Sequence, residues 1–342
     1  MNSAKPSAAA YAPGRVNLIG EHTDYNSGTA VPMTISMGTE VRYEAGGDQL
    51  VVESDLERSA AVVISPCVEI ESLVPWVRLC AALVRIAAPG LTGRIAVTSS
   101  LPSGAGLASS AALGVAMCLA VGVKPEPITL AQVCQKAEEA VGVPSGLMDP
   151  LVVAASLPDH ALLIDFAELS TRAIELPEDL EIVVVDSGER RTLSSSVYAE
   201  RRAECEAAAS RLGVPLGLAP QDAPGAIGDP VLRGRARHVV SEVRRVGTFV
   251  DALGAGDYET AGGALIESHR SLRDDFGVST PALDALVEEA CSMEAVYGAR
   301  LTGAGLGGCI IALCRPGAKL DLGTQLWRVR PGGAAHKLAP LA

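Results

Sequence analysis

Apolar and polar positions alternate and then recur at helical spacing between Val41 and about Val141, a pattern that predicts a mixed α/β domain. Within this region we expect a strand at Arg94 to Thr98 and a long helix from Ser109 to Val121. A second helix is predicted from Leu130 to Val141, with Thr129 as its N-cap.

The second half of the chain begins with strand-like runs and becomes mostly helical. Pro177 and alternating charges interrupt the pattern at Ser170 to Glu178, where we expect the chain to cross between two lobes. A Gly- and Pro-rich loop is expected from Val214 to Pro230. The remaining predicted elements are strands at Ala161–Ile164, Ile182–Val185, Arg300–Thr302 and Cys309–Cys314, and helices at Ser195–Leu212, Val231–Leu253, Tyr258–Arg273 and Ala282–Cys291.

The composition narrows the class of partner. The 342 residues are 48% hydrophobic and 20% charged, which suits a globular chain with two domains of ordinary size. The net charge of −12 disfavours a nucleic acid or an anionic membrane, because both attract positive charge. A small-molecule ligand is expected instead.

The apolar stretch Ala111 to Val123 is shorter than the ~18–20 residues of a membrane span, and the N-terminus lacks a signal peptide's apolar core. We therefore expect a cytoplasmic protein.

Eight cysteines lie mostly in apolar or helix-like segments and form no C-x-x-C pair. Buried, reduced thiols are the simplest interpretation and fit a reducing compartment. The five histidines form no H-x-x-x-H pair, which disfavours a zinc site. The cysteines are Cys67, Cys80, Cys118, Cys134, Cys205, Cys291, Cys309 and Cys314.

A first motif crowds Glu21, His22 and Asp24 together directly after an apolar run and Gly20. Carboxylates accept hydrogen bonds from neighbouring hydroxyl groups of a sugar, and imidazole can donate or accept. The motif therefore indicates a sugar site. Two alternatives are a turn with ordinary capping acids and a metal site formed by His22 and Asp24, although no third ligand is near in sequence.

A second motif, Leu101 to Ala112, has glycines followed by serines and an alanine-rich helix. Free backbone N–H groups at such a helix N-terminus can bind a phosphate. The motif is not a Walker A loop, because no Gly-Lys-Ser/Thr ends it and no lysine lies near it. Ser110 is in a position to reach a Mg²⁺ ion bound to phosphate oxygens. The alternative is that this segment is an ordinary N-cap.

A third motif, Leu301 to Ile311, contains G-x-G-x-x-G, but a strand-like run follows the glycines where a dinucleotide-binding fold requires a helix. We expect a tight loop between two strands that approaches a ligand.

Asp149 is a single acid in an apolar segment rich in Gly and Pro. Taken alone, it is interpreted as a helix-capping acid.

Taken together, these stretches resemble the galactokinases of the GHMP kinase family. The resemblance runs from about Ala12 to Leu313 and includes Cys134–Glu138, Gly146–Asp149, Ala161–Asp165, Tyr198 with Arg201 and Arg202, Arg235–Val240, Glu267–Phe276 and Tyr297–Thr302. It implies an N-terminal α/β lobe over residues 1–172 and a C-terminal ferredoxin-like lobe over residues 173–342. It also implies that ATP and a sugar, galactose, bind in the cleft between the lobes.

The resemblance also implies roles for individual residues. Asp149 and Arg15 would flank the reacting sugar hydroxyl, and Asp149 would take or orient its proton while Arg15 keeps Asp149 ionised and offsets developing charge. The predicted sugar contacts are Glu21, His22, Asp24, Gly146 and Tyr198. The predicted ATP contacts are Trp76 at the adenine and Gly104, Ala105, Gly106, Leu107, Ala108, Ser109 and Ser110 at the phosphates. The predicted Mg²⁺ ligands are Ser110 and an acid at Glu138 or Glu139.

Four positions depart from the family pattern. Ala108 stands where galactokinases usually have serine, Leu79 where they have tyrosine, Pro150 where they have glutamine and Leu306 where they have phenylalanine. None of these is a predicted catalytic residue. Two other functions remain open: a kinase for a related sugar such as N-acetylgalactosamine or arabinose, and a catalytically silent protein that senses sugar and ATP.

Overall fold

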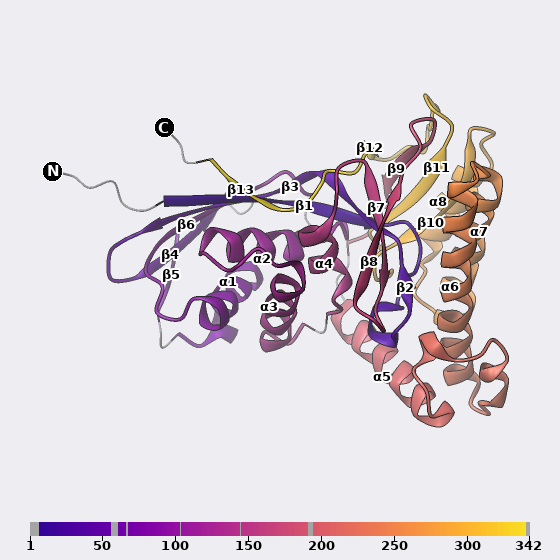
Figure 1. Ribbon diagram of the computed structural model, residues 1–342, viewed down its shortest axis with the longest axis horizontal. Helices are drawn as coiled ribbons and strands as arrows, with labels where there is room; N and C mark the ends of the chain where they lie inside the picture. The colour runs from indigo at the N-terminus through magenta and orange to yellow at the C-terminus, as the bar shows by residue number, and fades with distance from the viewer. Residues whose placement is uncertain are drawn as a thin grey trace.

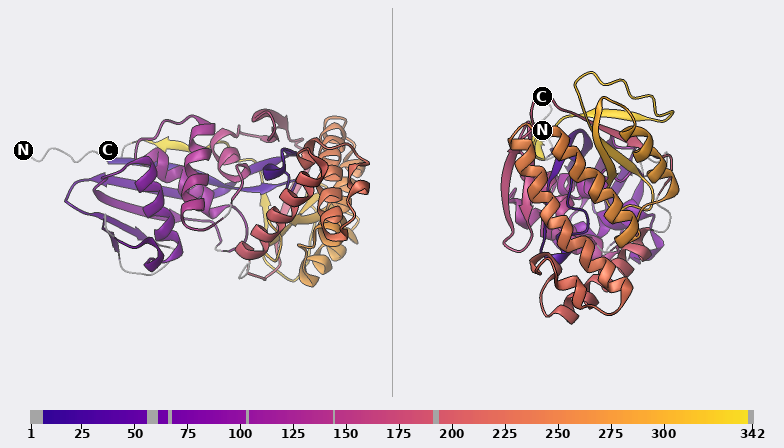
Figure 2. Two further views of the ribbon diagram at one scale, coloured as in Figure 1. Left: turned by 90° about the horizontal axis from the view of Figure 1, so that it is seen from below. Right: turned by 90° about the vertical axis from the view of Figure 1, so that its right-hand side faces the viewer.

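The computed structural model describes residues 7–55, 61–65, 68–102, 104–143, 145–190 and 194–339. Two sheets, each covered by helices, lie at opposite ends of an elongated molecule, and a smaller sheet lies between them (Figures 1 and 2). The two-lobed mixed α/β fold expected from the sequence is confirmed. The exact residue at which one lobe ends stays a prediction.

The first lobe is built on a six-stranded sheet with helices against one face (Figure 1). Strand β4 runs parallel to β6, and every other pair in this sheet is antiparallel. In sheet order, the strands are β13 (His336–Leu338), β1 (Ser7–Asn17), β3 (Pro32–Ala45), β6 (Gly93–Ser99), β4 (Leu50–Ser54) and β5 (Val62–Ile64). The helices are α1 (Pro75–Ala87), α2 (Ser109–Ala120), α3 (Pro127–Ala140) and α4 (Met148–Ala155), with a 3₁₀ turn, η2, at Ile70–Ser72.

Helix α2 forms the centre of this lobe. From Ala111 to Ala120 all its residues are buried, and it packs against β1 and β3. Most of these residues are small, so the helix can lie close to the sheet. Its N-terminus is thereby held at the edge of the lobe that faces the second lobe.

The second lobe has a four-stranded antiparallel sheet in the order β10-β11-β9-β12. These strands are β9 (Glu181–Asp186), β10 (Val296–Thr302), β11 (Cys309–Cys314) and β12 (Leu326–Val329). Helices α7 and α8 pack on β10, and α6 packs on α7. The helical elements are α5 (Ser194–Leu212), 3₁₀ turns η3 (Leu216–Leu218) and η4 (Ala223–Ala226), α6 (Pro230–Gly254), α7 (Tyr258–Ser271), the π-helical η5 (Leu272–Phe276) and α8 (Pro281–Cys291).

The small sheet joins β2 (Thr29–Ala30) to β7 (His160–Asp165) and β8 (Ser170–Glu175), and a 3₁₀ turn, η1, covers Asp24–Asn26. Strand β8, which the sequence pattern did not predict, occupies part of the expected crossover, and the crossover itself stays a prediction. That strand pairs with β7 alone and buries only Ile174. An edge strand with one buried residue gives a weak alternation of polar and apolar positions, which is why the pattern missed it.

The predicted N-cap at Thr129 is also wrong. Helix α3 begins at Pro127, and the Glu126 carboxylate accepts hydrogen bonds from the backbone N–H groups of Ile128 (3.2 Å) and Thr129 (2.7 Å). Proline is favoured in the first turn of a helix because its missing N–H would have no partner there. The helix therefore begins at Pro127, before the predicted start at Leu130.

Among the described cysteines, six are buried and Cys291 is half-buried, as expected, while Cys67 lies outside the described residues. No described helix combines the length and the apolar character needed to cross a membrane.

Candidate active site

A cavity of about 280 Å³ lies where residues of the two lobes meet. Its residues come from β1, from the segment after Gly20, from α2 to α5, and from the loop between β10 and β11. The lining residues are Arg15, Glu21, His22, Asp24, Ser110, Glu138, Val143, Ser145, Gly146, Met148, Asp149, Tyr198, Gly303 and Ala304. Most of the predicted sugar, metal and catalytic residues are thus brought together.

Arg15 and Asp149 form a two-pronged ion pair at this cavity. Nε of Arg15 donates to Oδ1 of Asp149 at 2.7 Å, and its Nη2 donates to Oδ2. The side chain of Arg15 is 5% exposed, whereas that of Asp149 is 31% exposed. The Asp149 carboxylate can therefore accept a further hydrogen bond from a ligand in the cavity.

The interpretation of Asp149 as a capping acid is wrong. Helix α4 begins at Met148 with Leu147 as its N-cap, and no side chain caps it. Asp149 is the second residue of the helix, and its carboxylate pairs with Arg15 instead. The same guanidinium donates from Nη1 to the carbonyl oxygen of Gly106 at 2.8 Å. Arg15 thereby joins Asp149 to the glycine-rich loop.

That loop, described from Gly104 onward, winds into α2 through left-handed residues. Gly104, Gly106 and Ala108 have φ angles of 71°, 80° and 59°. Ala108 is the N-cap and makes no side-chain cap, and the helix begins at Ser109. Ser110 is therefore the second helical residue, so the alternative that it is an ordinary N-cap is wrong. The first turn of α2 lacks the side-chain acceptor that most helices have there.

Ser110 faces Glu138 of α3 across the cavity lining. Burial raises the pKa of the Glu138 carboxyl, which is 8% exposed, while the neighbouring hydroxyls of Ser145 and Ser110 oppose that shift. Glu139, the other candidate for the metal acid, is exposed to solvent and does not line the cavity. The geometry thus distinguishes two glutamates that the sequence left equivalent.

Asp24 is a half-buried acid beside Gly146. Burial, followed by repulsion from the carboxylates of Asp149 and Glu21, raises its pKa to about 7. Backbone hydrogen bonds from Tyr25 and Met148 only partly oppose this. Near neutral pH, Asp24 is therefore able to exchange between a carboxylate that accepts hydrogen bonds and a carboxylic acid that also donates one.

Aromatic rings surround His22. Its Nδ1 lies 2.9 Å from the hydroxyl of Tyr25, and its ring centroid lies 5.9 Å from that of Tyr198. Burial raises the pKa of Tyr198 well above its usual range. His22 itself has a left-handed backbone, with φ of 61°.

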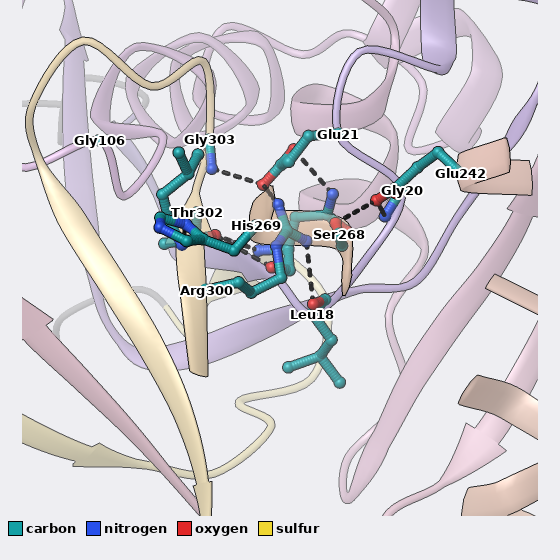
Figure 3. A network of polar contacts seen from close by, with 12 residues as sticks. Leu18, Gly20, Glu21, Gly106, Glu242, Ser268, His269, Arg300, Thr302 and Gly303 are labelled. Atoms are coloured by element: carbon teal, nitrogen blue, oxygen red, sulfur yellow. Dashed lines mark hydrogen bonds and ion pairs between the residues drawn. The ribbon is translucent and has the colours of Figure 1, made fainter. Parts of the chain in front are cut away.

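Glu21 is held by both lobes (Figure 3). Its Oε2 accepts from Nδ2 of Asn17 at 2.8 Å. Its Oε1 accepts from the backbone N–H of Gly303 at 2.5 Å and pairs with Nη2 of Arg300 at 3.0 Å. Arg300 is fully buried and also donates to the carbonyl oxygen of Leu18 at 3.0 Å. Glu21, in the first motif, is therefore hydrogen-bonded to the loop of the third motif at Gly303.

Helices α6 and α7 support the same segment from the other side (Figure 3). The buried Glu242 accepts from the backbone N–H of Gly20 at 3.0 Å and from the Ser268 hydroxyl at 2.6 Å. Burial would raise the pKa of Glu242, but Arg245, His238, Arg300 and the Ser268 hydroxyl bring it to about 2. The carboxylate therefore stays charged and acts as a fixed acceptor for the backbone of this segment.

The third motif connects two strands, β10 and β11, as the sequence predicted. Two of its residues, Gly303 and Ala304, line the cavity. No individual site role was predicted from the sequence for these two residues or for Val143, Ser145 and Met148. The nearest signal was the run of glycines in the third motif, which predicted a loop approaching a ligand.

Trp76 and the residues from Gly104 to Ser109 do not line this cavity. Trp76 is half-buried in the first turn of α1 and packs on the core of the first lobe. Their predicted roles at the adenine and the phosphates remain predictions.

Comparison with known proteins adds an independent line of evidence. Three family models match: the galactokinase galactose-binding signature over residues 2–43, the GHMP kinases N terminal domain over 76–156 and the GHMP kinases C terminal model over 249–324. A galactokinase of Roseiflexus sp. (strain RS-1) is 43% identical over 330 residues, which cover 90% of this chain and 83% of the relative. The chain belongs to the galactokinase family.

Other members of the galactokinase family are nearly as similar. The Homo sapiens galactokinase is 40% identical over 336 residues, covering 92% of this chain and 86% of that protein. A crystal structure of Lactococcus lactis galactokinase complexed with galactose is 28% identical and matches with a TM-score of 0.87 over 99% of this chain and 97% of that one. A crystal structure of L. major mevalonate kinase in complex with R-mevalonate is 20% identical and matches with a TM-score of 0.67 over 97% of this chain and 99% of that one, so it shares the fold.

Proposed function

We propose that this protein is an ATP-dependent galactokinase that transfers the γ-phosphoryl group of ATP to the anomeric hydroxyl of D-galactose, giving galactose 1-phosphate and ADP. Membership of the galactokinase family supports the reaction class. The single observation that carries the proposal is the position of the Arg15–Asp149 pair. It faces the cavity of Asp24 and His22, and through Gly106 it touches the glycine-rich loop.

The sugar would bind among the polar side chains of the cavity. Asp24 and His22 offer an acid and an imidazole to its hydroxyl groups, and Tyr198 offers a phenol. Gly146 lines the cavity with its backbone alone, which leaves room for the sugar. Glu21 lines the same cavity, although its carboxylate also holds Asn17, Arg300 and Gly303.

ATP would place its phosphates at the N-terminus of α2, where backbone N–H groups point outward and the helix dipole favours negative charge. Mg²⁺ fits the neighbouring side chains, because the Ser110 hydroxyl and the Glu138 carboxylate are oxygen donors that line one wall of the cavity. A Mg²⁺ ion held there would neutralise charge on the phosphate oxygens.

Phosphoryl transfer needs positioning and charge neutralisation more than covalent help from the protein. In the proposed mechanism, Asp149 accepts or orients the proton of the anomeric hydroxyl, using oxygen lone pairs that Arg15 leaves open. Arg15 holds the carboxylate in one orientation through two hydrogen bonds and offsets the negative charge that develops nearby.

A coupled ADP-release assay with a panel of sugars tests the proposal. We expect turnover with galactose and much slower turnover with glucose, talose, N-acetylgalactosamine and arabinose. Faster turnover with N-acetylgalactosamine or arabinose would instead identify a kinase for a related sugar. Sugar and ATP binding without ADP release would identify a silent sensor. Either result would overturn the proposal.

The proposal also includes a cytoplasmic location. Free thiols are typical of reducing compartments and support this location. They are found at Cys80, Cys118, Cys134, Cys205, Cys291 and Cys314.

A further inference from the structure

Behind the cavity, the ring of His22 lies against the ring of Phe276. Their centroids are 4.5 Å apart, and the ring planes meet at 31°. Phe276 is fully buried and does not line the cavity. It comes from the second lobe, about 250 residues along the chain from His22, so that the contact joins the sugar-site loop to the helical layer.

The rings of Tyr25, Tyr198 and Phe276 lie around the ring of His22. Its backbone is left-handed, a conformation that costs an ordinary L-residue free energy. The amide of Asn26 fixes that backbone by donating to the His22 carbonyl oxygen at 2.8 Å. Tyr25 contacts one edge of the ring through Nδ1. Of the three rings, that of Phe276 lies closest to the imidazole and at the smallest interplanar angle, so it constrains the plane of the imidazole most.

An irregular helix places Phe276 there. Helix α7 widens at its end into the π-helical segment η5, of which Phe276 is the last residue. The segment closes when the N–H of Gly277, with φ of 68°, donates to the carbonyl oxygen of Leu272. The wider turn rotates Phe276 relative to its position in a regular α-helix. Single π-helical turns often occur at functional sites.

Phe276 also contacts Arg235 and His238 of α6. The Arg235 guanidinium carbon lies 5.6 Å from the ring centroid, within the range of a cation–π contact. Arg235 donates to Oε2 of Glu204 and to the carbonyl oxygen of Asp275, both at 2.6 Å. The ring of His238 lies 4.7 Å away. The ring of Phe276 thus contacts both a hydrogen-bonded cation and the imidazole of the sugar site.

We propose that Phe276 is a positioning residue for sugar recognition, which sets the plane of the His22 imidazole from the second lobe without touching the sugar. This inference rests on the proposed function. It assigns the π-helical segment η5 a role in the sugar affinity of the site and none in the binding of ATP.

The first test measures galactose affinity by calorimetry in the full-length Phe276→Leu protein. We expect the Kd for galactose to rise about tenfold, within the range of couplings measured between contacting residues, and the KM for ATP to stay unchanged. Phe249→Leu is the matched control, because Phe249 is equally buried but packs in the apolar cluster that includes the core of the first lobe and does not line the cavity. It should lose similar thermal stability and keep its galactose affinity. Should Phe276→Leu not fold, Phe276→Met also removes the ring, and its unbranched, flexible side chain adapts better to the space that the ring leaves.

A double-mutant cycle separates positioning from a general loss of packing. His22→Asn keeps a residue that tolerates the left-handed backbone. In that background, Phe276→Leu should change galactose affinity less than twofold. An equal effect with and without His22, or no effect in the parent protein, would overturn the inference. If the parent protein itself does not bind galactose, the proposed function fails first.

Discussion

Gly146 lies so close to Asp24 that a β-carbon at position 146 would stand 1.5 Å from Oδ2 of the carboxylate. The two residues are far apart in sequence and meet at the cavity wall. The φ angle of Gly146 is not in the left-handed range, so its backbone conformation does not require glycine. Glycine is needed here because a side chain would collide with Asp24.

Gly146→Ala should therefore displace Asp24 and weaken galactose binding. Overpacking typically costs ~1–3 kcal/mol, so calorimetry should show a Kd for galactose at least about fivefold higher, with ATP affinity preserved. Gly247→Ala is the control, since its β-carbon would meet no atom within 4 Å on α6. That variant should bind galactose normally and gain ~0.5–1 kcal/mol of stability. Unchanged sugar affinity in Gly146→Ala would mean that Asp24 does not contact the sugar.

Asp149→Asn keeps the size of the side chain and removes its ability to accept a proton. General bases contribute typically ~10²- to 10⁴-fold in rate, so kcat should fall by at least the lower figure, while the Kd for galactose changes little. Circular dichroism and a melting curve matching the parent protein would show that the variant is folded. A folded variant with more than about a tenth of the parental kcat would remove Asp149 from the proton-transfer role.

Asp24 makes stability depend on pH in a defined window. Burial and nearby carboxylates raise its pKa from the ordinary 3.8 to about 7. Between these values the folded protein binds the proton more tightly than the unfolded chain does, so this contribution to stability falls as pH rises and then levels off. Asp24→Asn cannot ionise. Urea unfolding without sugar should therefore show the variant gaining stability relative to the parent between pH 4 and pH 8. Parallel stability curves would contradict the raised pKa.

Glu138 and Glu139 allow a paired test of the metal acid. Glu138→Gln should raise the Mg²⁺ concentration needed for half-maximal activity by about tenfold or more, because its carboxylate faces Ser110 in the cavity. Glu139→Gln should leave that requirement unchanged, since Glu139 is exposed. Glu138→Gln also removes a buried acid whose pKa burial raises, so thermal unfolding should show no loss of stability. Equal Mg²⁺ requirements in both variants would exclude Glu138 as the metal acid.

The sequence was sufficient for elements with a strong local pattern. Helix α2, helix α6 and strand β11 lie within one residue of their predicted bounds, because each is long or almost wholly apolar. Strand β8, by contrast, buries a single residue and gives little periodicity.

The residue patterns alone predicted only the contiguous parts of the site, and the resemblance to galactokinases added distant residues such as Asp149 and Tyr198. Glu21, His22 and Asp24 stand together in the sequence, and the cavity brings them together with Asp149. The contact of Phe276 with His22 depends on a π-helical turn, and no residue pattern in that segment indicates one. Whether Ser110 and Asp149 cap helices likewise depended on where those helices begin, which a local pattern does not fix to one residue.

Strand β13 pairs with β1, so that Leu338 lies opposite Ala9 and His336 opposite Tyr11. The segment before it is fastened to the same lobe, since the N–H of Ala335 donates to the carbonyl oxygen of Val153 at 2.8 Å. Contacts between residues so distant along the chain form late, because a very large loop must close first. During synthesis, the edge of β1 that pairs with β13 stays unpaired until the second lobe has left the ribosome. An unpaired strand edge can pair with other chains and so promotes aggregation. The first lobe to be translated is therefore the last to complete its sheet.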